Sequence, residues 1–128
     1  MIKALPYGLG DRNSIEQFTF DPVNTGTSRI AKETNLPGCV VEIRTFDSLI
    51  SGLNISLSER IMFKLDLEGM EVEAILGAAD FIEKYPHITF ILEDKHSGQN
   101  QIKKTLNQLG SFEFGEIDEY NFYAKKLN

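Results

Sequence analysis

The spacing of apolar residues is most regular in the second half of the chain. Residues 61–65 and 87–92 are short apolar runs, which are typical of strands buried on both faces. Between them, residues 70–85 carry apolar side chains at helical spacing, and Pro86 ends this predicted helix. Strand–helix–strand units usually form a right-handed crossover that joins two parallel strands, so we expect these two strands to be parallel neighbours.

The last third of the chain continues this alternation. A helix is predicted from Ser97, which can cap it, to Leu109, and Gly110 ends it. Two final strands at 112–117 and 120–126 are close enough in sequence to form an antiparallel hairpin. The predicted fold class is therefore α/β, with parallel strands, crossover helices and a C-terminal hairpin.

The first part of the chain is less regular and richer in turn-forming residues. Its predicted elements are strands at 2–7, 15–20 and 39–44, a loop at 21–38 and a helix at 47–53. The segment Gly8–Asp11, with Asn13, is interpreted as a turn between two strands. Because a strand follows it rather than a helix, the pair Gly8 and Gly10 is not expected to bind a pyrophosphate.

Composition narrows the function classes. The 128 residues fit one domain, and a net charge of -6 argues against binding to nucleic acid or to anionic membranes. No stretch has the length of a membrane span or the pattern of a signal peptide, so a cytoplasmic protein is predicted. The single cysteine, Cys39, is interpreted as a small buried hydrophobe rather than a nucleophile.

Candidate chemistry lies where the two predicted parallel strands end. Asp66 and Glu68 follow the first strand, and the segment from Glu93 to His96 follows the second. Ligands bind outside the carboxyl ends of parallel strands, so these ionisable groups could serve acid–base chemistry or contact a metal. Composition alone favours a simpler interpretation, since acidic residues also stabilise a helix N-terminus. A metal-dependent nuclease is disfavoured by the intervening helix and by the acidic net charge.

The order and spacing of several short blocks resemble the FkbM methyltransferase family over nearly the whole chain. The most specific block is the lysine-x-aspartate-x-glutamate-glycine sequence at Lys64–Gly69, which a helix follows. The other blocks are Gly8–Asp11, Asn24–Ser28, Thr45–Leu49, Ile75–Ala78 and Phe90–Glu93.

This resemblance implies a Rossmann-like enzyme that moves a methyl group from S-adenosylmethionine to a hydroxyl of a sugar, lipid or natural product. Asp66 and Glu68 would be catalytic, and Glu93 and His96 would bind the acceptor. The family's first two strands and glycine-rich loop would precede Ile2. Residues 1–128 are thus expected to be a single partial domain, truncated and poor at binding the cofactor alone. No cofactor-binding residue and no metal ligand is assigned.

Two further expectations concern partners. A non-catalytic α/β module that binds a partner or has a structural role is the alternative to the enzyme. The strand at 61–65 lacks its neighbour in the complete fold, and such an open edge favours pairing. Either the N-terminal strands cover it, or a second copy pairs with it in a symmetric dimer, or another chain supplies the missing strands.

Overall fold

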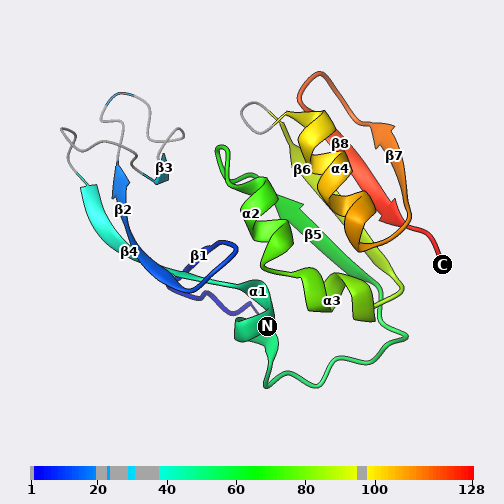
Figure 1. Cartoon of the computed structure of the whole chain (residues 1–128), viewed down its shortest axis with the longest axis horizontal. Coiled ribbons are helices and arrows are strands. Elements are labelled where there is room, and N and C mark those ends of the chain that lie inside the picture. Colours follow the sequence, from blue (N-terminus) through cyan, green and yellow to red (C-terminus); the bar gives the residue numbers. More distant parts are fainter. Residues whose placement is uncertain (1, 20–22, 24–28, 31–37, 95–97) are drawn as a thin grey trace.

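The computed structural model describes residues 2–19, 23, 29–30, 38–94 and 98–128. These residues form two four-stranded sheets, and helices pack against the second (Figure 1). Both sheets are mixed, with parallel and antiparallel pairs. The α/β class predicted from the sequence is confirmed.

The second sheet contains the parallel pair. Its strands, in spatial order, are β5 (Ile61–Leu65), β6 (Ile88–Glu93), β8 (Asn121–Lys126) and β7 (Phe112–Glu116). The strands β5 and β6 are parallel, with Ile61 opposite Ile88 and Leu65 opposite Leu92. The strands β7 and β8 form the expected antiparallel hairpin. The predicted parallel pair and the hairpin are both confirmed.

Three helices cover one face of this sheet, the face toward the viewer in Figure 1. They are α2 (Glu71–Leu76), α3 (Ala79–Lys84) and α4 (Gln99–Leu109). Ile75, Ile82 and Leu106 from these helices are fully buried against Phe90 and Phe122 of the sheet. No helix in the described part of the chain is long and apolar enough to cross a membrane.

The prediction of one continuous helix over 70–85 is wrong, because the chain breaks between α2 and α3. The carbonyl oxygen of Gly77 accepts a hydrogen bond from the backbone N–H of Asp47, 3.0 Å away. The Asp47 carboxylate in turn accepts from the backbone N–H groups of Asp80 and Phe81, each at 3.0 Å. The Asp47 side chain, from outside the helix, therefore caps the N-terminus of α3 and allows a second helix to begin there.

The first sheet differs more from the expected pattern. Its elements are β1 (Gly8–Leu9), β2 (Ser14–Thr19), β3 (Arg29–Ile30) and β4 (Gly38–Arg44), followed by α1 (Phe46–Ile50). The predicted strands at 15–20 and 39–44 correspond to β2 and β4. The helix predicted at 47–53 is shorter and begins earlier. Most of the predicted loop at 21–38 lies outside the described residues.

The prediction of a strand at 2–7, followed by a turn at Gly8, is also wrong. Residues 2–7 form no strand and are exposed, whereas Gly8 and Leu9 pair in parallel with Ile43 and Arg44 of β4. Residues 2–7 have no strand beside them in the described residues, and a strand forms only where backbone groups find partners.

The interpretation of Cys39 as buried is wrong as well. Cys39 is exposed near the start of β4, where none of the described helices covers the first sheet (Figure 1). The described N-terminal strands pair with one another in the order β1-β4-β2-β3. They therefore do not cover the edge of β5.

A cluster that we call the Asp47 joint fixes the first sheet to the helices. It consists of Asn13, Thr45, Asp47 and Gly77. The Asn13 Oδ1 accepts a hydrogen bond from the Thr45 backbone N–H at 3.0 Å, and Thr45 caps α1. At Gly77 an added Cβ would lie 1.9 Å from the carbonyl oxygen of Gly10, so only glycine permits this approach.

Candidate functional site

The carboxyl ends of β5 and β6 bring together two side chains that the sequence singled out. Leu65 lies opposite Leu92, so Asp66 and Glu93 follow at adjacent positions on the same end of the sheet. Their side chains share a hydrogen bond, and the Asp66 side chain is 41% exposed. We call this pair the carboxylate rim.

The surroundings of Asp66 at the rim raise its pKa. The hydrogen bond with Glu93 is the main cause that raises the pKa of Asp66 above its ordinary value. Partial burial and the charges of Glu93 and Glu68 also raise the pKa of Asp66, while Lys64, with its Nζ 3.9 Å from Asp66 Oδ2, opposes them. Asp66 thus holds its proton more tightly than an isolated aspartate would.

The loop between β5 and α2 contains a second kind of carboxylate. Glu71 is only 3% exposed, and its side chain accepts hydrogen bonds from the backbone N–H groups of Leu67 at 2.8 Å and Gly69 at 3.1 Å. Glu71 therefore holds the shape of the loop. A purely structural role at the start of a helix, which the sequence also allowed for these acidic residues, fits Glu71. The same role does not explain Asp66, which lies beside another carboxylate.

Glu68 occupies an unusual backbone position in the same loop. Its φ angle is 50°, in the left-handed region that side chains other than those of glycine, asparagine and aspartate seldom adopt, and Gly69 follows with φ 105°. Such strain costs of order 1 kcal/mol and tends to cluster at functional sites. The loop thus carries Glu68 close enough for its charge to act on Asp66.

The segment after β6 contains Asp94 and His96, the two remaining residues to be considered. Asp94 accepts a hydrogen bond from the backbone N–H of Gly98 at 2.7 Å, just before α4, and its own N–H donates to Tyr120 O at 2.8 Å. Asp94 is therefore a structural residue. The candidate His96 lies outside the described residues, so its predicted role is untested.

Sequence reasoning missed the long-range part played by Asp47 and Asn13. It placed Asp47 at the start of a local helix, but the Asp47 carboxylate caps α3, more than thirty residues later. Thr45 followed by Ser48 is a recognisable local capping pattern, and the Ser48 N–H does donate to Thr45 Oγ1 at 3.2 Å. No local signal identifies the more distant contact.

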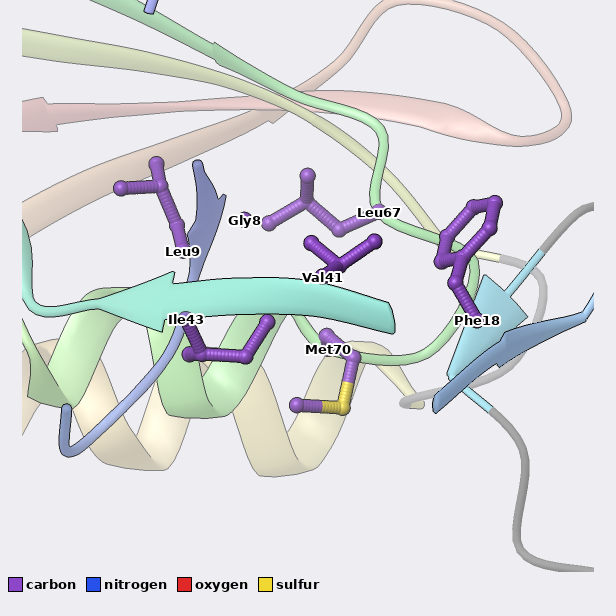
Figure 2. Close-up of a pocket in the computed structure, with 7 residues that line it drawn as sticks. All are labelled: Gly8, Leu9, Phe18, Val41, Ile43, Leu67 and Met70. Carbon is purple, nitrogen blue, oxygen red and sulfur yellow. The ribbon is translucent and has the colours of Figure 1, made fainter. Parts of the chain in front are cut away.

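An apolar pocket lies beside the loop that follows Asp66. It has a volume of about 90 Å³, and Figure 2 shows the side chains that surround it. They come from the first sheet and from the loop after β5, and they are Gly8, Leu9, Phe18, Val41, Ile43, Leu67 and Met70. This lining includes no charged or hydrogen-bonding side chain.

In the described part of the chain, no group of three or more histidine, cysteine, aspartate or glutamate side chains is arranged to hold an ion. The carboxylate rim contributes a pair of such side chains. What this pair can do is exchange a proton with a bound hydroxyl group and accept a hydrogen bond from it.

Comparison with known proteins gives one positive result. A family model, described as the methyltransferase FkbM domain, matches residues 2–125. This region includes the Asp47 joint, the carboxylate rim and the apolar pocket. The comparisons with curated proteins and with solved structures give no match.

Proposed function

Because this chain belongs to the FkbM methyltransferase domain family, we propose that it carries the acceptor-binding side of a site that methylates a hydroxyl group. The observation that carries the proposal is the carboxylate rim. Two carboxyl groups share a hydrogen bond at the end of a parallel strand pair, where ligands of open α/β sheets bind. A sugar, a lipid or a natural product would supply the hydroxyl.

In this proposal Asp66 is the general base. Its pKa is raised by the hydrogen bond with Glu93 and by partial burial, so its ionised form is a stronger proton acceptor than an ordinary aspartate. A hydroxyl that donates a hydrogen bond to Asp66 gains nucleophilic character at its oxygen. Glu93 would hold the acceptor through a further hydrogen bond, and Glu68 is the second candidate base. His96 keeps its predicted role on the acceptor side.

Methyltransferases of this kind generally use S-adenosylmethionine, which supplies an electrophilic methyl group. The apolar pocket does not fit this molecule. A site for a ligand of this size typically has a volume of about 300–1,000 Å³ and several placed polar groups. The pocket of about 90 Å³ has only apolar side chains around it. We assign no cofactor-binding residue and expect weak binding or none by isothermal titration calorimetry; low-micromolar affinity would contradict this.

The test of the function joins this chain to a cofactor-binding segment of the same family. A segment of another FkbM protein, containing the first strand and the glycine-rich loop, is fused before Ile2. Transfer of a labelled methyl group is then measured with sugar, lipid and natural-product hydroxyls. We expect transfer to one class, and Asp66→Asn should lower kcat about 100-fold. Asp80→Asn, an exposed position on α3, is the matched control. Equal rates for the two variants would contradict the role of Asp66.

A non-catalytic module that binds a partner is the second candidate, and the apolar pocket favours it. The same assay separates the two. If the fused protein folds and binds S-adenosylmethionine but transfers no methyl group to any acceptor class, the non-catalytic function is the better account.

A further inference from the structure

We propose that three backbone carbonyl oxygens at the C-terminal end of α3 form a binding site for a primary ammonium group, and that Lys126 occupies this site from within the chain. The three oxygens belong to Ile82, Glu83 and Tyr85, and we call them the carbonyl triad. The triad lies at the end of the second sheet away from the carboxylate rim, and the proposal does not depend on methyl transfer.

The carbonyl triad lies where α3 ends. The last carbonyl groups of an α-helix have no N–H partner within the helix, and they form the negative end of its dipole. Because α3 ends at Lys84, two oxygens of the triad belong to its last turn, and the third belongs to the cap residue Tyr85. A cation that also carries hydrogen-bond donors is the type of ligand that suits this position.

The ammonium group of Lys126 donates to all three oxygens of the triad. Its Nζ lies 2.9 Å from the Tyr85 oxygen and 3.2 Å from the Glu83 oxygen, and the Ile82 oxygen is its third acceptor. A lysine ammonium group has three N–H donors and no acceptor. The triad therefore matches the full donor capacity of the ligand, although Lys126 comes from a strand more than forty residues later.

The aliphatic part of the Lys126 side chain passes over Gly110, the C-terminal cap of α4. A Cβ added at Gly110 would lie 3.2 Å from Cε of Lys126 and 4.0 Å from its Cδ. The backbone beside Lys126 is also fixed, since the N–H of Leu127 donates to the carbonyl oxygen of Ser111 at 2.8 Å. A regular strand thus delivers the ammonium group to the triad, and a site held by regular elements is more precise than one on a loop.

Burial alone would disfavour an ammonium group at this position. Loss of contact with water lowers the pKa of Lys126 below its ordinary value, and the charge of Glu83 opposes this shift. A charged donor that is withdrawn from water is stable only where protein acceptors replace the lost water. The carbonyl triad supplies these acceptors, so the site selects N–H donors as well as positive charge.

The first test uses the chain without any substitution. Nuclear magnetic resonance measures how fast the hydrogens of the lysine ammonium groups exchange with water, and Lys126 is compared with its exposed neighbour Lys125. We expect exchange at Lys126 to be slower by roughly tenfold or more, because its N–H groups are bonded to the triad. Equal exchange rates at the two lysines would overturn the proposal.

The second test empties the triad and refills it. Lys126→Ala removes the ammonium group and should lower the melting temperature by about 4 °C, whereas Lys125→Ala, the matched control, should not. Added propylammonium ions should restore much of this loss, because a ligand that binds only the folded state stabilises it. Tetramethylammonium ions carry the same charge but no N–H donor, and they should give no recovery.

A further variant separates the ammonium group from the packing of its aliphatic stem. Lys126→Met keeps an unbranched apolar side chain over Gly110 but has no donor for the triad, so it should also melt at a lower temperature than the unsubstituted chain. Equal melting temperatures for these two proteins would contradict the proposal. Equal recovery of Lys126→Ala with propylammonium and tetramethylammonium would also contradict it, since the response would then be to ionic strength and not to a binding site.

Discussion

The Asp47 joint and the carboxylate rim both place acidic side chains at the ends of secondary structure, but their surroundings are opposite. At the joint, each Asp47 carboxylate oxygen accepts a backbone hydrogen bond. At the rim, Asp66 shares its hydrogen bond with another carboxyl group, and its pKa is raised. The joint therefore stabilises the fold, whereas the surroundings of the rim disfavour the ionised form of Asp66. Acidic residues of one family pattern thus lie in two different electrostatic surroundings.

The largest effect is expected at Gly77. The Cβ of Gly77→Ala would meet the backbone carbonyl of Gly10 at 1.9 Å, so α2 must move away from the first sheet. We expect a loss of about 3 kcal/mol in the free energy of unfolding, measured by urea denaturation. Gly52→Ala is the control, since nothing lies within 4 Å of its Cβ. If both variants unfold at the same urea concentration, the joint is not tightly packed.

A smaller loss is expected when the cap of α3 is removed. Asp47→Ala leaves the backbone N–H groups of Asp80 and Phe81 without their acceptor. The expected cost is about 1–2 kcal/mol in the free energy of unfolding. Asp47→Asn keeps one acceptor oxygen and should lose less. Asp80→Ala removes only an exposed carboxylate. If it lowers the free energy of unfolding as much as Asp47→Ala does, the loss in Asp47→Ala does not come from the missing cap.

The smallest effect, with the opposite sign, is expected at the rim. The folded pKa of Asp66 lies above its unfolded value, so stability falls as the pH rises through the folded pKa. Asp66→Asn removes a group whose ionised form the fold disfavours, and should raise the free energy of unfolding at neutral pH by about 0.5 kcal/mol or less, because the pair is partly exposed. Below the ordinary pKa of aspartate the gain should vanish. A loss of stability at neutral pH would mean that Asp66 is structural.

The sequence predicted the regular half of this molecule well and the joint poorly. Apolar runs and helical spacing identified β5, β6, the hairpin and α4, because each buries a continuous apolar face. The parallel pairing then placed Asp66 beside Glu93. The break at Gly77 was not predicted, since it depends on the contact with Asp47, thirty positions earlier. Residues 2–7 have a strand-like pattern but no strand beside them in the described residues.

The central claim is that Asp66 is reactive and Asp47 is structural, and one paired measurement tests it. In the fusion with an FkbM cofactor-binding segment, methyl transfer and melting temperature are measured for Asp66→Asn and Asp47→Ala. We predict that Asp66→Asn keeps its melting temperature and loses about 100-fold in kcat. Asp47→Ala should have a lower melting temperature and retain its kcat per folded molecule. If Asp66→Asn instead loses activity only in proportion to its loss of folded protein, the rim is a structural feature and the claim is contradicted.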